Sequence, residues 1–275
     1  MEDGALEKKE METLMQLPIY QVDAFTNGAF SGNPAAIVIL DEWLPDPTLQ
    51  AIAEENNLSE TAFVVPRADH FHLRWFTPTV EVDLCGHATL ASAHVIFRHG
   101  YTEKKQIVFQ SKGGRLTVTR QGELLAMDFP ALPPRRLEDD PAIGQALGAT
   151  PRELYTTRDL LAVFENQKDV EALAPDFPAV AQLDTFAIIA TAPGEDCDFV
   201  SRFFAPAKGI PEDPVTGSAH CTLVPYWSAR LGQSKLHAKQ LSSRGGEIFC
   251  EHQGERVVLM GRTKEYLRGD IDIDV

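Results

Sequence analysis

A weak internal repeat constrains the fold of this chain more than any other feature of its sequence. The segment Phe-Thr-Pro at Phe76 is followed ten residues later by Gly86, which opens a predicted helix. The segment Phe-Ala-Pro at Phe204 is followed thirteen residues later by Gly217, which opens a second predicted helix. A chain that repeats a strand, a loop and a helix in this way is expected to build one structural unit twice.

A second pair of segments repeats in the same order and at a similar distance along the chain. Residues 35–54 read as a buried strand, a Leu-Pro-Asp turn and a helix, and residues 161–180 echo this pattern. Two such pairs indicate a duplicated module of about 130 residues. A length of 275 residues also suggests two domains, at about 150 residues per domain.

A charged, proline-rich segment marks the boundary between the modules. Five of the six residues 135–140 are charged, and four prolines surround this segment: Pro130, Pro133, Pro134 and Pro141. We therefore predict an N-terminal domain over residues 17–128 and a C-terminal domain over residues 129–275, whose last strand is free to return to the first domain. Residues 1–16 are polar and predict a flexible extension rather than a targeting peptide.

Local patterns predict the elements of the first module. Apolar alternation and short apolar runs predict strands over residues 19–24, 35–40, 61–65 and 72–76, and a hairpin over residues 107–119. Helical spacing predicts helices over residues 46–57 and 86–99. The second of these helices is apolar round most of its circumference, so we expect it to be buried inside its domain.

Charge and cysteine content exclude several classes of protein. The 40 acidic and 25 basic side chains give a net charge of −15, which opposes binding to nucleic acid or to an anionic membrane surface. No apolar run reaches the ~20 residues of a membrane span. The four cysteines form no Cys-x-x-Cys pair, which argues against a zinc ribbon or a dithiol site. Sparse cysteine and the lack of a recognisable signal peptide predict a cytoplasmic protein.

Each module places a glycine-led, buried helix after a polar loop. The helices start at residues 85–87 (Cys-Gly-His) and 216–218 (Thr-Gly-Ser). A helix N-terminus exposes unpaired N–H groups and carries about half a positive charge. Two such ends facing each other across a domain interface would bind a small carboxylate.

Five motifs, in order along the chain, point to one known family. They read Asp-Ala-Phe at 23–25, Gly-Asn-Pro-Ala-Ala at 32–36, Asn-Leu-Ser-Glu-Thr-Ala-Phe at 57–63, Leu-Cys-Gly-His-Ala-Thr-Leu at 84–90 and Glu-Asp-Pro-Val-Thr-Gly-Ser-Ala at 212–219. From Leu17 to the C-terminus the chain resembles the PhzF-like family of phenazine-biosynthesis isomerases. The resemblance implies the α+β fold of diaminopimelate epimerase: two pseudo-symmetric domains, each a curved sheet or barrel wrapped round a central helix, with the active site between them.

The resemblance also implies roles for individual residues. Glu60 corresponds to the general acid/base, although by itself it reads as a solvated carboxylate at the entrance to a strand. A glutamate that moves a proton is expected to be partly removed from water. His87 and Asp213 correspond to further catalytic residues. Four residues correspond to substrate-binding positions: Gly86, Thr216, Gly217 and Ser218.

Structural roles provide plainer alternatives for the two other catalytic candidates. His87 lies in the first turn of a predicted helix, where a capping or packed histidine is common. We expect the positive helix end to lower the pKa of His87 and to keep the ring neutral. Asp213 precedes the second helix, where an acid is also expected as a partner of the helix dipole.

Cysteine and histidine patterns give no sign of thiol or metal chemistry. Epimerases of this fold use two opposed thiols at the helix starts, whereas this chain has Cys85 at one start and Thr216 at the other. A threonine hydroxyl is too weak an acid for that role, so we interpret Cys85 as a packed thiol. His70 and His72 lack a third ligand nearby in the sequence, so we expect no metal site. Without a GxGxxG motif or a P-loop, no nucleotide cofactor is expected.

We therefore predict a cytoplasmic, cofactor-free isomerase that moves a proton within a small carboxylic acid, with cyclic, amino and hydroxy acids among the candidates. In the best known reaction of the family the substrate is a dihydro-hydroxyanthranilate. One alternative is an amino-acid epimerase or racemase, which would need a second base opposite Glu60 or Cys85. Another is a non-catalytic protein-interaction member of the family. A homodimer is implied by the resemblance alone.

Overall fold

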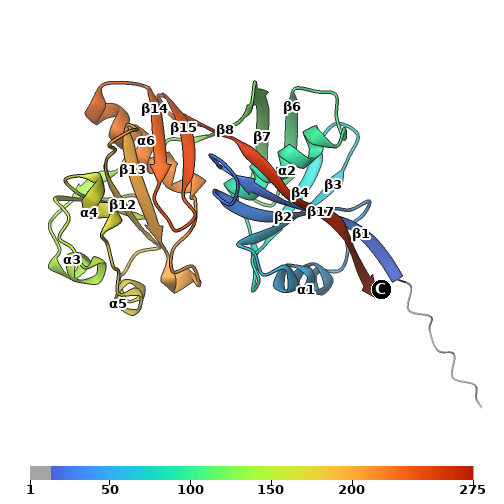
Figure 1. The fold of residues 1–275 in the computed structure, drawn as a ribbon, viewed down its shortest axis with the longest axis horizontal. Coiled ribbons are helices and arrows are strands. Elements are labelled where there is room, and N and C mark those ends of the chain that lie inside the picture. The colour runs from blue at the N-terminus through green and yellow to red at the C-terminus, as the bar shows by residue number, and fades with distance from the viewer. Residues whose placement is uncertain (1–13, 275) are drawn as a thin grey trace, which may run out of the picture.

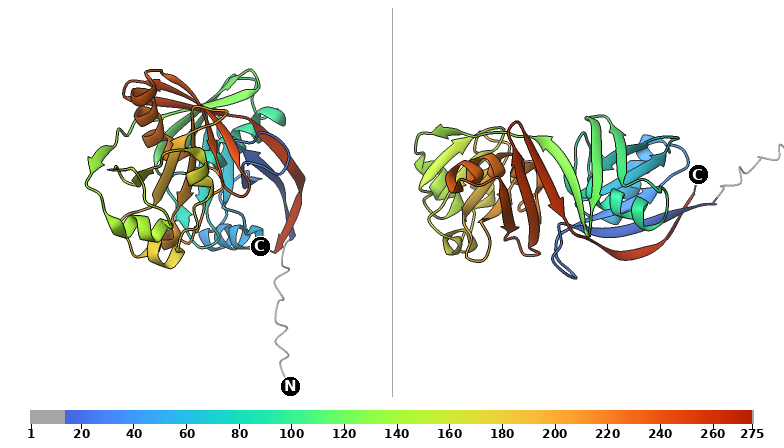
Figure 2. Two further views of the ribbon diagram at one scale, coloured as in Figure 1. Left: turned by 60° about the vertical axis from the view of Figure 1, so that its left-hand side comes forward. Right: turned by 90° about the horizontal axis from the view of Figure 1, so that it is seen from above.

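Two similar lobes make up the computed structural model, which describes residues 14–274 (Figures 1 and 2). Each lobe is a curved sheet around one central helix, α2 (Gly86–Arg98) in the first lobe and α6 (Gly217–Leu231) in the second. This is the predicted α+β architecture with two pseudo-symmetric units. Within the described range, no helix has the length and apolar character needed to cross a membrane.

The first lobe contains eight strands and two helices between Leu14 and Pro130. Besides α2, its elements are β1 (Leu14–Ala24), β2 (Asn33–Ile39), α1 (Asp46–Asn56), β3 (Glu60–Pro66), β4 (Phe71–Phe76), β5 (Glu81–Val82), β6 (Gln106–Ser111), β7 (Gly114–Gln121) and β8 (Leu124–Pro130).

The second lobe begins after β8 and repeats this plan, with three short α-helices in addition to its central one. Besides α6, its elements are β9 (Arg135–Leu137), α3 (Pro141–Leu147), β10 (Glu153–Thr156), β11 (Leu160–Val163), α4 (Gln167–Glu171), α5 (Phe177–Ala181), β12 (Ile188–Pro193), β13 (Phe199–Phe204), η1 (Pro206–Lys208), β14 (Lys235–Gln240), β15 (Gly246–Gln253) and β16 (Arg256–Gly261). The last strand, β17 (Thr263–Asp274), runs back to the first lobe.

Strand pairing confirms the repeat that the sequence predicts. The pairs β2–β3 and β11–β12 are parallel. In each pair the two strands are connected along the chain by helices, α1 in the first lobe and α4 and α5 in the second. The pairs β3–β4 and β12–β13 are antiparallel. The pairs β4–β6 and β13–β14 are parallel, and in each of them the central helix of the lobe lies between the two strands in the sequence. The antiparallel series β6–β7–β8 corresponds to β14–β15–β16.

The two lobes are interlocked by strands that cross between them. β8 and β16 pair antiparallel and join the two sheets. After β8 the chain forms β9, which pairs with β10 of the second lobe. After β16 it forms β17, which pairs with β1 of the first lobe from Ala24–Thr263 to Leu14–Asp274, as Figure 1 shows. In each lobe, the strand that comes after the last hairpin therefore pairs with a strand of the other lobe.

Two elements differ from the sequence predictions. The first strand begins at Leu14 rather than near Leu17, because Leu14, Met15 and Gln16 pair with the end of β17. The rest of the predicted N-terminal extension, residues 1–13, lies outside the described residues. The single helix expected within residues 161–180 is two five-residue helices, α4 and α5, because Pro175 and Pro178 cannot continue a helix.

The central helices are buried on nearly every side. α2 is buried from His87 to Ala93, and its hydroxyl groups are satisfied internally, since Ser92 donates a hydrogen bond of 2.7 Å to the Ala88 carbonyl. In α6, Pro225 lacks the N–H that would bond the Cys221 carbonyl. The backbone N–H of Leu132, in the linker between the lobes, donates to that carbonyl at 2.8 Å instead. The proline thus leaves a helix carbonyl free to accept a hydrogen bond from the linker.

Candidate active site at the lobe interface

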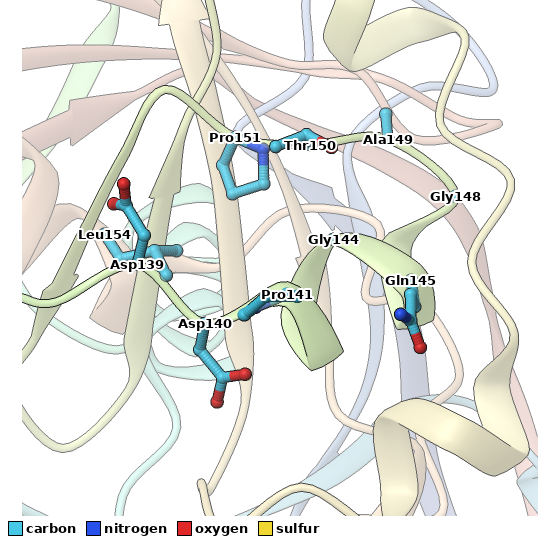
Figure 3. Close-up of a pocket in the computed structure, with 10 residues that line it drawn as sticks. All are labelled: Asp139, Asp140, Pro141, Gly144, Gln145, Gly148, Ala149, Thr150, Pro151 and Leu154. Atoms are coloured by element: carbon cyan, nitrogen blue, oxygen red, sulfur yellow. The ribbon is translucent and has the colours of Figure 1, made fainter.

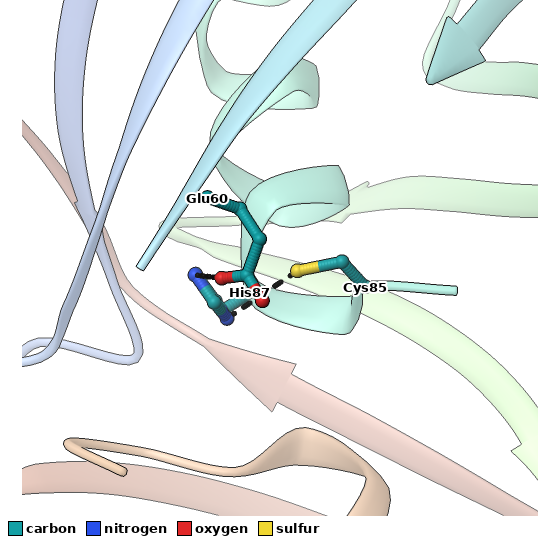
Figure 4. A group of neighbouring side chains, drawn as sticks. All are labelled: Glu60, Cys85 and His87. Carbon is teal, nitrogen blue, oxygen red and sulfur yellow. Dashed lines mark hydrogen bonds and ion pairs between the residues drawn. The ribbon is translucent and has the colours of Figure 1, made fainter. Parts of the chain in front are cut away.

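Glu60 and His87 meet where β3 and α2 begin. Glu60 is the first residue of β3, paired with Ala35 of β2, and His87 lies in the first turn of α2. Nε2 of His87 lies 3.0 Å from Oε2 of Glu60, and the side chains are only 7% and 12% exposed (Figure 4). On the other side of the ring, Nδ1 lies 3.5 Å from Sγ of Cys85. The structure thus brings two of the predicted catalytic residues into contact and removes both from water.

Part of this pair is left without a hydrogen bond. Among the described residues, Oε2 of Glu60 and Nε2 of His87 have no partner with good hydrogen-bond geometry, although the two atoms lie 3.0 Å apart. Buried polar groups without a partner cost about 1–3 kcal/mol each. Such groups are therefore concentrated where a ligand supplies the missing bonds.

Asp213 comes from the second lobe but is held by the first. The side-chain amide of Asn33, the first residue of β2, donates to Oδ1 of Asp213 at 3.0 Å and to the Val215 carbonyl at 2.9 Å. The hydroxyl of Thr216 donates to Oδ2 of Asp213. Because both neighbours of the Asn33 amide nitrogen are acceptors, the orientation of this amide is fixed. Oδ1 of Asn33 is buried and has no partner in the described part of the chain.

Gln240, the last residue of β14, forms hydrogen bonds to the same loop. Its side-chain nitrogen donates to the Asp213 carbonyl at 2.8 Å, and its side-chain oxygen accepts from the Thr216 N–H at 2.8 Å. Sequence reasoning missed Gln240 and used Asn33 only as part of the motif at residues 32–36, with no role in the site. The Gly-Asn-Pro motif could have identified Asn33, whereas a buried glutamine at the end of a strand carries no sequence signal.

Electrostatics connect Asp213 to the pair in the first lobe. Burial raises the pKa of Asp213 to about 6, although the charge of His87 and the hydrogen bond from Thr216 act to lower it. The negative charge of Glu60 raises it further. These electrostatic effects link Asp213 of the second lobe to the Glu60–His87 pair of the first lobe.

The expected neutral His87 is wrong. Burial lowers the pKa of His87, as the helix end was expected to do, but the Cys85 sulfur and the Glu60 carboxylate oppose this effect. The net pKa lies well above the ordinary value. Burial also raises the pKa of the Cys85 thiol to about 11, so the thiol is neutral at physiological pH. The sulfur and the carboxylate on either side of the ring thus raise the pKa of His87, which is the opposite of the direction that the helix end predicts.

The predicted substrate-binding residues lie at the starts of α2 and α6. Gly86 and Gly217 are the first residues of these helices, and Ser218 is half-buried in the first turn of α6. The preceding residues, Cys85 and Thr216, form no side-chain hydrogen bond to their helices. The first-turn N–H groups are thus left without side-chain caps, as a binding site for an anion requires.

Three side chains of the candidate site have the spacing of metal ligands. Glu60, Cys85 and His87 each offer an atom within 4.8 Å of the others. However, the imidazole turns Nε2 toward the carboxylate and Nδ1 toward the sulfur (Figure 4). An imidazole between two partners suits proton transfer better than chelation, in which one nitrogen would face the metal with the other ligands.

A cavity in the second lobe lies apart from this cluster. It has a volume of about 470 Å³ and lies between the first turn of α3 and the segment that leads into β10 (Figure 3). Asp139 and Asp140 line it, and none of its lining residues is basic. Such a cavity does not suit an anionic ligand, so the candidate site is the cluster at the lobe interface.

Two pseudo-symmetric α+β lobes with ionisable side chains at their interface define the class of epimerase-like isomerases. A solved hydroxyproline epimerase from Agrobacterium vitis shares this fold, with a TM-score of 0.61 over 96% of this chain and 95% of that one. Its sequence identity is 11%, so the likeness concerns the fold alone.

The chain belongs to the PhzF-like family. The family model described as phenazine biosynthesis-like protein matches residues 22–269. An uncharacterized isomerase of Pseudomonas aeruginosa is 49% identical over 259 residues, covering 94% of this chain and all of that protein. A solved PhzF-family structure from Enterococcus faecalis is 46% identical, with a TM-score of 0.92 over 94% of this chain and 99% of that one. The protein is an isomerase of this family.

Proposed function

We propose that this isomerase moves a proton between two carbon atoms of a small carboxylic acid, with Glu60 as the general acid/base. The observation that carries the proposal is the nearly buried Glu60–His87 ion pair, in which Oε2 and Nε2 lack hydrogen-bond partners among the described residues. A carboxylate held out of water beside a cation is poised to accept and return a proton.

The proposed reaction uses each predicted residue in turn. The Glu60 carboxylate removes a proton from one carbon, and the released electron pair is delocalised into the unsaturated acid. The proton on Glu60 exchanges with solvent, and Glu60 then protonates a second carbon on the same face, so the substrate loses one proton and gains one. His87 stabilises the carboxylate before the transfer, and Asp213 orients an amino or hydroxyl group of the substrate. The reaction is redox-neutral, so the proposal includes no cofactor.

Substrate binding is proposed at the two helix starts. The uncapped N–H groups at Gly86, Gly217 and Ser218 would hold the substrate carboxylate, with the hydroxyl of Thr216 beside them. Two positive helix ends also suit an anion in a chain of net charge −15, because the wider field of the protein repels it.

Deuterium incorporation from D₂O tests this function. The panel comprises a dihydro-hydroxyanthranilate and a series of unsaturated, amino and hydroxy carboxylic acids, each incubated with wild type and with Glu60→Gln. We expect wild type to label one compound and Glu60→Gln to slow labelling by at least about 10²-fold, the usual contribution of a general acid/base. Equal labelling by both proteins would contradict the role of Glu60. No labelling of any acid by folded wild type would favour the protein-interaction alternative.

Amino-acid epimerisation is the second candidate. Epimerisation needs two acid/base groups on opposite faces of one carbon, and Asp213, with a pKa of about 6, is supplied by the lobe opposite Glu60. The same experiment separates the two reactions. Label at the α-carbon with inversion of configuration indicates epimerisation, whereas label at a different carbon with a moved double bond indicates the proposed isomerisation.

A further inference from the structure

The residues that precede the two central helices share an unusual property. Cys85 and Thr216 have the extended backbone of N-cap residues, with φ and ψ of −142° and 113° and of −109° and 98°. At this position a side-chain oxygen usually accepts a hydrogen bond from a first-turn N–H. Neither side chain does so, although threonine is well suited to that role.

Each of these side chains contacts an ionisable group of the site instead. The sulfur of Cys85 lies 3.5 Å from Nδ1 of His87, and the hydroxyl of Thr216 donates to Oδ2 of Asp213. The two residues occupy equivalent places in the pseudo-symmetric lobes, one before α2 and the other before α6. The same departure from capping therefore occurs twice, once for each catalytic candidate that lies beside a helix start.

We propose that Cys85 and Thr216 are positioning residues: each side chain contacts an acid/base group of the site and fixes its orientation. Cys85 orients the imidazole of His87, and Thr216 orients the carboxylate of Asp213. A second consequence is that the first-turn N–H groups of both helices stay open to a ligand, because no side chain occupies them.

The chemistry of each pair fits its position. Sulfur is a weak donor and a weak acceptor, so it contacts Nδ1 without competing strongly with the Glu60 carboxylate for the hydrogen of the ring. Because a carboxylate is the stronger acceptor, the neutral ring keeps the hydrogen on Nε2, and Nδ1 accepts from the thiol. A hydroxyl is a good donor, and it complements the Asn33 amide on the other oxygen of Asp213. A simple packed thiol at residue 85 would have no effect on the ring.

Substitutions at Cys85 separate positioning from packing. Serine can cap a helix and alanine cannot, so Cys85→Ser is expected to have a higher Tm than Cys85→Ala. Both variants lose the sulfur and are expected to slow deuterium incorporation about tenfold, the effect of one lost hydrogen bond. The two Cys85 variants are therefore expected to differ in stability but to be slowed equally in labelling. Cys197→Ala, which removes a half-buried thiol in the loop before β13, is the matched control with unchanged labelling.

Nitrogen NMR of the histidine ring gives a readout that does not depend on a substrate. Protein labelled with ¹⁵N-histidine is titrated to the pH at which His87 loses its proton, and its signals are identified by their absence from His87→Gln. We expect wild type to keep the hydrogen on Nε2, toward the Glu60 carboxylate, and both Cys85 variants to show a shifted Nδ1 signal, because Nδ1 has lost its contact with the thiol. Unchanged ring signals in both Cys85 variants would overturn the proposal for Cys85.

Substitutions at Thr216 test the second half of the proposal. Thr216→Ser keeps the hydroxyl, whereas Thr216→Val loses it, so labelling by the valine variant is expected to be about tenfold slower than labelling by the serine variant. The acid limb of the pH profile also moves to higher pH in Thr216→Val, because the Asp213 carboxylate loses a donor while Glu60 and His87 still face it. Identical rates and pH profiles for the serine and valine variants would refute this role.

The labelling measurements rest on the proposed function, whereas the NMR measurement does not. If no acid of the panel is labelled by wild type, the proposed function fails, and the Nδ1 signal of His87 still decides the role of Cys85. For Thr216 the ¹³C shift of the Asp213 carboxyl carbon replaces the labelling rate. A higher Asp213 pKa in Thr216→Val than in Thr216→Ser supports the proposal, and equal values contradict it.

Discussion

Asp213 illustrates how a single residue combines opposing physical effects. Burial disfavours its charged form, whereas the donors on Asn33 and Thr216 and the charge of His87 favour it. The result is a carboxyl group with a pKa of about 6, close to the pH at which a proton is easily exchanged. The same balance has a measurable consequence for stability.

We predict that Asp213→Asn gains stability relative to wild type as the pH rises from 4 to 7. In the folded protein the pKa is raised from 3.8 to about 6, so between these values the folded state holds a proton that the unfolded state has lost. The stability of wild type therefore falls as the pH rises through this window, by about 3 kcal/mol in total. An asparagine does not titrate. Urea unfolding of both proteins at pH 4 and pH 7 measures the change, and a constant difference between them would contradict the raised pKa.

At the same scale, motifs identified which residues meet, but not how they are held. The motifs at residues 57–63, 84–90 and 212–219 contain Glu60, His87 and Asp213, and these side chains do come together. The amides of Asn33 and Gln240 reach Asp213 from 180 and 27 residues away, so no local pattern reveals them. The charge of His87 was misjudged because it depends on a carboxylate that only the fold brings to 3.0 Å.

At the scale of elements, the end of β1 connects the two lobes. Phe25 follows β1, is fully buried, and has a positive φ of 56°, which is uncommon for a bulky residue. Its carbonyl accepts a hydrogen bond of 2.9 Å from the N–H of Glu247 in β15. Its ring packs against Gly261 at the end of β16. Phe25 of the first lobe thus packs against and bonds to the sheet of the second lobe.

We predict that Gly261→Ala weakens this connection. A Cβ at residue 261 would lie 2.4 Å from the ring of Phe25 and 3.2 Å from its Cα, and a fully buried ring has no space to move into. Overpacking of this kind costs about 1–3 kcal/mol of the free energy of unfolding. Gly269→Ala in β17 meets no atom within 4 Å and is the matched control. Equal unfolding free energies for the two variants, measured in urea, would contradict the tight seat of Phe25.

Element prediction succeeded where the determinants are local. The helix over residues 86–99, the hairpin after it and the parallel strands of the first module follow from spacing and turn residues. The division of the second module's helix into α4 and α5 was missed because the echo with residues 35–54 outweighed two prolines. That β17 pairs with β1 depends on contacts between the two ends of the chain, which no local pattern encodes.

At the scale of the whole molecule, the resemblance implies a homodimer, and we propose that state in solution. β17 is paired with β1 along one edge, and Tyr266 and Leu267 on this strand are 58% and 45% exposed. Large apolar side chains on a long outer strand favour association. Size-exclusion chromatography with light scattering is expected to give twice the chain mass of 30.4 kDa. A single species at the chain mass would remove the proposal.

The interlocked strands lead to a prediction about how the molecule unfolds. β9 and β17 cross between the lobes, and β8 pairs with β16, so neither lobe can lose its sheet without exposing an edge of the other. We therefore expect both lobes to unfold in one transition, unlike domains joined by a simple linker. The chain offers a reporter in each lobe, because Trp75 in β4 and Trp227 in α6 are both 1% exposed.

Two variants make the measurement specific to each lobe. Replacing Trp43 and Trp227 by Phe leaves Trp75 to report the first lobe, and replacing Trp43 and Trp75 leaves Trp227 to report the second. Within each variant, the fluorescence transition in urea is expected to coincide with the circular dichroism transition, which follows both lobes. Comparing two signals of one protein removes the effect of the substitutions on stability. If fluorescence followed only one phase of a biphasic circular dichroism curve, the lobes would be independent, and the crossing strands would not couple them.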